Sequence, residues 1–150
     1  MVTLRPATHE DLEFAFAALR AAMRTYVEAT WGPWDEGWQH RLFADTFVPA
    51  THRIIEQSGR AVGCMAVEEK PDHVFLARIF LLPEAQGQGI GTRLVGRLCE
   101  SAHRRGLPVV LTILKVNPAR RLYERLGFTV VGETETHFRM ECPPRPLPAT

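Results

Sequence analysis

Apolar residues recur at helical spacing in the first fifth of the chain. They stand three or four positions apart, as on one face of a helix: Leu12, Phe16, Leu19, Met23 and the pair Tyr26–Val27. Thr8 followed three residues later by Asp11 is a weaker form of the capping box that begins a helix. The pattern predicts a long amphipathic helix that ends near Thr30, where Trp31-Gly32-Pro33 interrupts it.

The rest of the chain alternates short apolar runs with turn residues. We expect further helices at residues 35–46, 90–105 and 118–126, the last with Pro118 at its first position. We expect strands at residues 2–5, 52–57, 61–68, 73–82, 109–114, 128–133 and 136–141. The run at 109–114 is rich in β-branched residues and predicts a fully buried central strand. This order of elements predicts a mixed α/β sheet whose first strands form an antiparallel meander.

Composition and charge narrow the class of protein. The 150 residues are 45% hydrophobic, which suits a single domain over 1–142 followed by a Pro-rich tail at 143–150. Net charge is +1 and the arginines are scattered, so we expect no nucleic-acid partner. No apolar run approaches the ~20 residues of a membrane span, so we expect no membrane partner.

The cysteines point to a reducing compartment. Cys64, Cys99 and Cys142 are an odd number, lie far apart and form no C-x-x-C pair. With the absence of a signal-peptide pattern in the first ten residues, they predict a cytoplasmic chain with buried, reduced thiols. No spacing of cysteines and histidines suggests a metal site, so we expect none.

A glycine-rich turn is the most informative segment of the sequence. In Gln86-Gly87-Gln88-Gly89-Ile90-Gly91, three glycines in five residues join a predicted strand to a helix. Glycines let the backbone approach a ligand closely, and unpaired N–H groups at a helix N-terminus attract anions such as pyrophosphate. A tight turn without a ligand is the alternative. A dinucleotide fingerprint is disfavoured by the G-x-G-x-G spacing, and a P-loop lacks its Gly-Lys-Ser/Thr.

Two blocks together resemble the GCN5-related N-acetyltransferase (GNAT) family. Residues 81–91 look like its acyl-CoA signature Q/R-x-x-G-x-G/A, with Gln86, Gly89 and Gly91 at the defined positions. Residues 117–128 are similar to its second signature, an Asn followed by a helix with Leu-Tyr-Glu and a closing Gly-Phe. The resemblance implies a splayed, mostly antiparallel sheet flanked by helices, and the transfer of acetyl from acetyl-CoA to a primary amine.

The same resemblance assigns roles around acetyl-CoA, which serves as co-substrate without a metal. The backbone of the strand before the turn would bond the pantetheine arm, the turn amides would hold the pyrophosphate, and Asn117 would bond the pantetheine. An Asx turn is the local alternative for Asn117, whose interval to Tyr123 is one residue shorter than the commonest family spacing. The implied contacts are Ile79, Phe80, Leu81, Gln86, Gly87, Gln88, Gly89, Ile90, Gly91, Thr92, Asn117 and Tyr123.

Catalysis in this family needs an acid and a route for the amine proton. Tyr123 matches the tyrosine that protonates the leaving thiolate, and packing beside Leu122 and Leu126 is its alternative role. Positions where some members carry a basic glutamate are Phe75 and Thr112 here. The candidate bases are therefore His73 and His137, with a water chain as an equal alternative, and with Glu68, Glu69 and Glu135 as further options.

The acceptor side is predicted from an aromatic cluster. Three tryptophans fall within eight residues after the first helix, and core packing of two helices is one interpretation. The other is an aromatic wall with carboxylates that attract a cationic amine, made of Tyr26, Glu28, Trp31 and Trp34, with Asp35 and Glu36 nearby. We expect a small-molecule amine. Protein N-alpha or lysine acetylation and a non-catalytic CoA-binding or sensor module are the alternatives, and a homodimer is compatible with the family.

Overall fold

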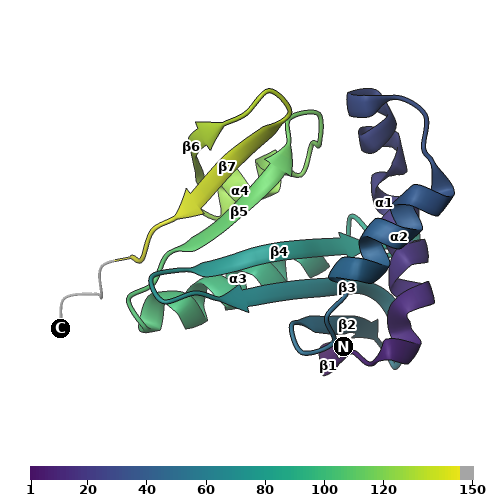
Figure 1. Cartoon of the computed structure of the whole chain (residues 1–150). Helices are drawn as coiled ribbons and strands as arrows, with labels where there is room; N and C mark the ends of the chain where they lie inside the picture. Colours follow the sequence, from purple (N-terminus) through teal and green to yellow (C-terminus); the bar gives the residue numbers. More distant parts are fainter. Residues whose placement is uncertain (146–150) are drawn as a thin grey trace. The chain divides into compact units, whose positions relative to one another are not determined.

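The computed structural model describes residues 1–145, so the last part of the expected tail lies outside the described residues (Figure 1). The strands are β1 (Val2–Pro6), β2 (His52–Gln57), β3 (Arg60–Glu69), β4 (Val74–Leu81), β5 (Val109–Leu114), β6 (Thr129–Glu133) and β7 (His137–Cys142). The α-helices are α1 (Leu12–Trp31), α2 (Glu36–Thr46), α3 (Ile90–Arg104) and α4 (Arg120–Arg125), and short 3-10 turns cover His9–Asp11 and Pro83–Ala85.

The strands follow the order β1-β2-β3-β4-β5-β7-β6, in which neighbours are hydrogen-bonded. Pairing is antiparallel for β1 with β2, β2 with β3, β5 with β7 and β6 with β7, and parallel for β4 with β5. The parallel register joins Val74 to Val109 and Phe75 to Val110, at the start of each strand. The predicted mixed, mostly antiparallel sheet flanked by helices is confirmed.

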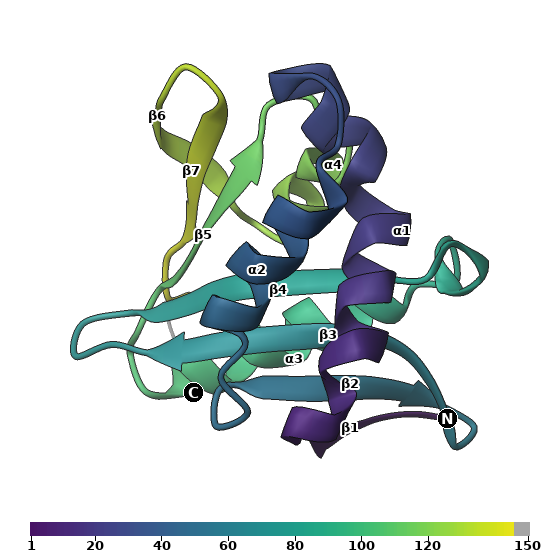
Figure 2. The same cartoon turned by 45° about the vertical axis from the view of Figure 1, so that its right-hand side comes forward.

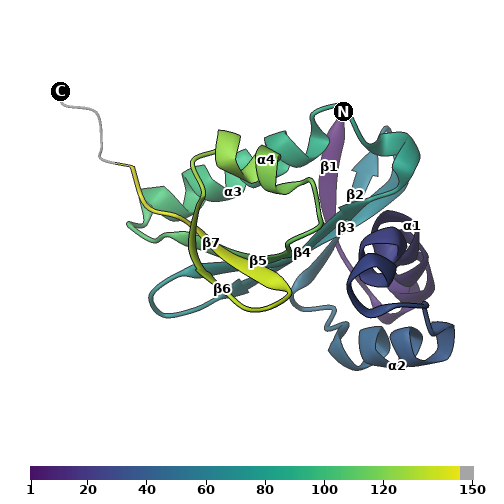
Figure 3. The same ribbon diagram turned by 90° about the horizontal axis from the view of Figure 1, so that it is seen from above.

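The chain forms two compact units, the first from residues 1–67 and 77–90 and the second from 68–76 and residue 91 onward. In the first unit, α1 and α2 lie beside each other, as Figures 2 and 3 show. Their apolar faces cover strand residues, so helices and sheet share one core: Ala15, Phe16, Ala18, Phe43, Phe47, Ile54, Cys64 and Phe80.

Local sequence signals begin and end the first helices as predicted. The Asp11 carboxylate accepts from the Thr8 amide at 2.8 Å and from the Arg5 guanidinium at 2.8 and 2.9 Å, and the arginine bonds lower the pKa of Asp11. Gly32 ends α1 with φ of +93°, which glycine adopts without strain. Asp35 caps α2 by accepting from the Trp38 amide at 3.0 Å.

The second unit packs α4 against α3. An ideal Cβ on Gly91 would lie 3.6 Å from Leu122, and one on Gly96 would lie 4.0 Å from Leu126. Leu122 of α4 and Leu126, which directly follows that helix, therefore sit over small residues of α3. In β5, five of six side chains are buried and Thr112 is exposed, so the prediction of a fully buried strand is wrong at that position.

The other correction concerns the start of α4. The helix begins at Arg120, two residues after the expected start at Pro118. The Asn117 carboxamide oxygen accepts from the Ala119 amide at 2.9 Å, and this Asx turn leads the chain into the helix. In the described part of the chain, no helix is both long enough and apolar enough to cross a membrane.

Candidate functional site

The glycine turn combines backbone conformations that only glycine adopts easily. Gly87 and Gly89 have φ of +76° and +79°, and a Cβ added at either position would meet nothing within 4 Å. Conformation, and not crowding, therefore requires glycine at both positions. The open space over them leaves the backbone accessible to a ligand.

Two glutamine side chains brace this turn. Gln86 Nε2 donates to the Leu81 carbonyl at 3.0 Å, which ties the turn to the end of β4. Gln88 Nε2 donates to the Glu84 carbonyl at 3.0 Å, and its Oε1 accepts from Gln57 Nε2 of β2 at 2.9 Å. The sequence carried no signal for Gln57, because it lies 31 residues from its partner. The turn is thus held in shape by its own unit.

The turn leads directly into α3, which begins at Ile90. The first four N–H groups of a helix have no partner within it, and the helix dipole places positive potential there. Gly91 differs from Gly87 and Gly89, since its φ is not positive and its neighbour is Leu122 at ordinary contact distance. The segment therefore offers an anion a row of backbone amides at the start of α3.

The strand before the turn presents backbone rather than side chains. Phe80 is 5% exposed and belongs to the core of the first unit, while Ile79 and Leu81 are half-buried. The Leu82 amide donates to the Val62 carbonyl at 2.8 Å, which holds the end of β4 on β3. The predicted role of this strand concerns only its backbone and stays a prediction.

Tyr123 lies in α4 and is 8% exposed. Its ring packs edge-on against Phe128, with centroids 5.6 Å apart. Burial raises the pKa of the Tyr123 phenol to about 12. The phenol therefore keeps its proton over the whole physiological pH range. Its ring is also a packed side chain, as the alternative role expected.

The two candidate histidines lie at opposite ends of β5. His73 precedes Val74, which pairs with Val109 at the start of β5, whereas His137 pairs with Leu114 at its end. Five residues of strand separate these positions, about 17 Å. Asn117 also lies at the Leu114 end, since its amide donates to the Leu114 carbonyl at 3.0 Å. The fold therefore brings His137 and Asn117 to one end and His73 to the other.

Each histidine has a local partner. His73 Nδ1 lies 2.7 Å from Asp72 Oδ1, and this bond lowers the pKa of Asp72. His137 Nδ1 lies 2.8 Å from the Thr136 hydroxyl, and the His137 amide donates to Thr134 Oγ1 at 3.0 Å. The alternative bases Glu68 and Glu69 form ion pairs with Lys70 and Arg105, at 3.0 and 3.1 Å.

The predicted acceptor residues differ in their burial and in their contacts. Glu28 accepts from the Trp34 amide at 3.2 Å and pairs with Arg24 at 3.5 Å, so its carboxylate joins α1 to the following loop. Trp34 is half-buried and packs against the core, whereas Trp31 is 59% exposed. Tyr26 is half-buried. Core packing therefore accounts for Trp34 but not for Trp31.

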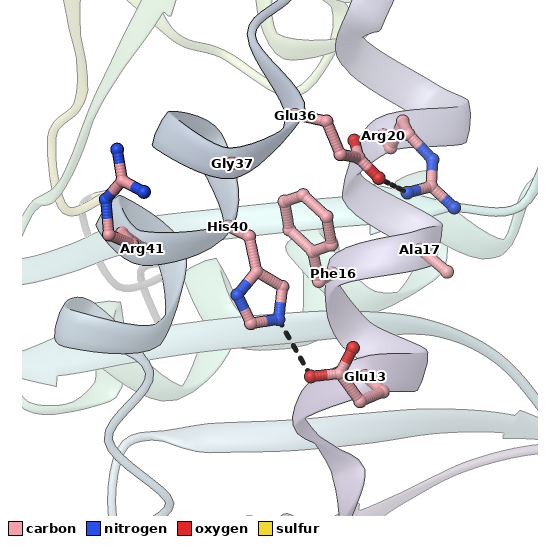
Figure 4. Close-up of a pocket in the computed structure, with 8 residues that line it drawn as sticks. All are labelled: Glu13, Phe16, Ala17, Arg20, Glu36, Gly37, His40 and Arg41. Carbon is pink, nitrogen blue, oxygen red and sulfur yellow. Dashed lines mark hydrogen bonds and ion pairs between the residues drawn. The ribbon is translucent and has the colours of Figure 1, made fainter.

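A surface depression of about 420 Å³ lies between α1 and α2 (Figure 4). Its floor includes the Phe16 ring, and its rim carries the ion pairs His40–Glu13, at 2.8 Å, and Arg20–Glu36. None of the four predicted acceptor residues is among those that line it. Both carboxylates of the depression thus have a partner, and the guanidinium of Arg41 also lines it.

Within the described residues, the cysteines and the side chains able to bind a metal form no further site. All three cysteines are free and buried, as predicted, and burial raises the pKa of the Cys64 and Cys99 thiols to about 12. Within residues 1–145, no group of three or more His, Cys, Asp or Glu side chains could hold a metal ion.

Comparison with known proteins identifies the family. Residues 16–128 match the family model described as acetyltransferase (GNAT) family, and this segment includes the glycine turn, Asn117 and Tyr123. The chain belongs to the acetyltransferase (GNAT) family.

Individual relatives agree with this assignment. An uncharacterized N-acetyltransferase of Methanocaldococcus jannaschii is 31% identical over 140 residues, covering 84% of this chain and 60% of that protein. Mycothiol acetyltransferase of Thermomonospora curvata is 34% identical over 135 residues, covering 85% of this chain and 44% of that protein. The chain thus spans only 60% and 44% of these relatives' lengths.

A solved structure shares the fold. PaiA N-acetyltransferase of Thermoplasma acidophilum, in complex with coenzyme A, matches with a TM-score of 0.75 at 18% identity. The match covers 95% of this chain and 99% of that one.

Proposed function

We propose that this chain transfers the acetyl group of acetyl-CoA to a primary amine of a small molecule. The observation that carries the proposal is the braced glycine turn, in which Gly87 and Gly89 both adopt positive φ before α3 in a chain of the GNAT family. The amides of residues 87–92 bind the pyrophosphate of acetyl-CoA, and the backbone of residues 79–81 bonds its pantetheine arm. Asn117 contributes a further pantetheine bond.

The use of backbone amides suits the charge of the chain. A pyrophosphate is strongly anionic, yet the net charge is only +1. Helix N-termini and left-handed glycine turns bind such anions through N–H groups and the helix dipole. The bound coenzyme A of the Thermoplasma relative supports coenzyme A as the ligand of this fold.

The reaction we propose is direct attack of the neutral amine on the thioester carbonyl. The new C–N bond forms as the C–S bond breaks, the thiolate takes the Tyr123 proton, and the attacking nitrogen loses one proton to a base. With a pKa of about 12, the phenol carries its proton at neutral pH and can donate it. It therefore acts as the acid for the departing thiolate.

His137 is the base that the strand register favours over His73. It shares the Leu114 end of β5 with Asn117, from which the chain continues into the helix of Tyr123. Ligands of sheets with parallel strands bind beyond the carboxyl ends of those strands, and Leu114 is the carboxyl end of β5. A water chain that carries the proton to solvent is the alternative.

The acceptor is proposed to be a small amine bound near the loop after α1. Trp31, the last residue of α1, is 59% exposed, and we propose that its indole ring contacts the cationic amine. Mycothiol acetyltransferase, a relative whose name gives a small-molecule acceptor, supports this class of substrate. Tyr26, Trp34 and Glu28 shape the loop, the last through its bond to the Trp34 amide.

A panel of amines with acetyl-CoA, read by release of free thiol, tests the proposal. We expect turnover with at least one small amine and weaker or no turnover with peptides that carry free α-amino groups or lysines. Turnover confined to peptides would favour a protein acetyltransferase. Binding of acetyl-CoA by calorimetry without turnover of any amine would favour a binding or sensor module, and absence of binding would overturn the proposal.

A further inference from the structure

Gly63 lies in β3, close against the backbone of β4. An ideal Cβ at this position would be 2.3 Å from the Phe80 carbonyl oxygen and 3.1 Å from Leu81 Cα. Its distance to the Leu81 Cδ2 atom would be 2.9 Å. Real Cβ atoms do not approach other atoms this closely, so a side chain at residue 63 requires the β4 backbone to move.

A β-bulge explains why the two strands meet in this way. On its other edge, β3 pairs Gly63 with Ile55 and Ala61 with Glu56, so Val62 is the extra residue. A bulge increases the local twist of a strand and redirects its Cα–Cβ bonds. Beside the bulge, the Val62 carbonyl accepts from the Leu82 amide at 2.8 Å, which holds the end of β4 in contact with β3.

We infer that Gly63 is a positioning residue, which sets the place of the Phe80–Leu81 backbone for binding of acetyl-CoA. The inference rests on the proposed function, in which this backbone bonds the pantetheine arm. Two contacts then fix the Leu81 peptide: Gly63 on the β3 side and the Gln86 carboxamide on the turn side. Neither is a catalytic residue, since neither needs to touch the substrate.

The nearest atom to a Cβ at residue 63 belongs to the backbone, so this position tolerates a side chain poorly. A clash with the tip of a flexible side chain is relieved by a rotamer change, but a carbonyl oxygen moves only with its strand. Displacement of a bound substrate by about 1 Å lowers catalytic rates by up to ~100-fold. A methyl group at residue 63 is therefore expected to weaken acetyl-CoA binding and turnover much more than its size suggests.

The test compares Gly63→Ala with a matched control, Gly132→Ala. Gly132 also lies beside a register shift, in β6, but a Cβ there would meet only Arg139 Cβ at 3.9 Å. We expect Gly63→Ala to raise KM and the calorimetric Kd for acetyl-CoA at least about tenfold, with KM for the amine changed by less than about twofold. Gly132→Ala should leave all three constants within about twofold of the wild type.

A second variant separates the clash with the Phe80 carbonyl from the clash with the Leu81 side chain. It also gives a further measurement if Gly63→Ala folds poorly. The double variant Gly63→Ala/Leu81→Ala removes the Cδ2 contact and leaves the Phe80 carbonyl in place, so we expect the acetyl-CoA defect to persist. Recovery of wild-type affinity in the double variant would overturn the inference, as would a lower melting temperature with unchanged KM and Kd. If the wild-type chain bound no acetyl-CoA, the proposed function itself would fail.

Discussion

The side-chain amide of Gln86 donates a hydrogen bond of 3.0 Å to the backbone carbonyl of Leu81. This bond gives a physical role to a glutamine that the sequence identified only as a signature position. It connects the first residue of the glycine turn to the last residue of β4, two segments proposed to bind different parts of acetyl-CoA. The five predictions that follow test this connection and the chemistry around it.

Removal of the Gln86 amide should loosen the turn. For Gln86→Ala we expect KM for acetyl-CoA to rise about three- to tenfold, which corresponds to loss of one hydrogen bond of about 1 kcal/mol. KM for the amine should not change. Steady-state kinetics with Gln39→Ala of α2 as the matched control checks this, and equal effects in both variants would contradict a specific role for Gln86.

The glycines of the turn should differ in their tolerance of alanine. Gly89 has φ of +79°, where an L side chain costs about 1–2 kcal/mol, whereas Gly91 has an ordinary φ and contacts Leu122 at 3.6 Å. Gly89→Ala should lower the free energy of unfolding by that amount and weaken acetyl-CoA binding, and Gly91→Ala should unfold near the wild-type midpoint. Urea titration and calorimetry measure both. A larger loss of stability for Gly91→Ala would contradict the assignment.

Loss of the Tyr123 hydroxyl should slow the chemical step. In Tyr123→Phe we expect kcat to fall about 100-fold with KM for acetyl-CoA nearly unchanged, because a general acid acts in the transition state. Since the phenol has a pKa of about 12, the wild-type kcat profile should show no basic limb from this group below pH 10. An unchanged kcat in the variant would mean that the thiolate leaves without this acid.

The same buried phenol predicts alkaline destabilisation. Its folded pKa of about 12 exceeds the value of about 10 in the unfolded chain, so the unfolded state loses its proton first as pH rises. The contribution is complete below pH 10 and is lost between pH 10 and 12, up to ~3 kcal/mol for a shift of this size. Tyr123→Phe should show a smaller loss of unfolding free energy over that interval. Parallel denaturation curves for both proteins would contradict this.

The two histidines should have unequal effects on catalysis. His137→Ala should lower kcat, because a general base takes the amine proton in the transition state. His73→Ala should leave kcat within about twofold of the wild type, because His73 lies at the opposite end of β5. Kinetics from pH 5.5 to 9 check both variants. If neither variant lowers kcat, a water chain carries the proton.

Several features of the fold follow from local sequence patterns. The expected strands at 52–57 and 109–114 agree with β2 and β5 at both ends, and the expected long helix ends one residue from the observed end of α1. These elements are bounded by residues with local effects, such as the capping Asp11 and the left-handed Gly32. The expected start of α4 was two residues early, and the bond from the Ala119 amide to Asn117 lies in the turn just before the helix.

The sequence by itself determined the family and the glycine turn, because both depend on residues close together along the chain. Only the tertiary structure decided that Gly63 faces the Phe80 carbonyl, that Gln57 braces Gln88, and that Glu28 is held by the Trp34 amide. Contacts such as these depend on strand pairing, bulges and helix packing between residues far apart in the chain. A local pattern contains no register, and a shift of one residue in the pairing redirects every side chain of a strand.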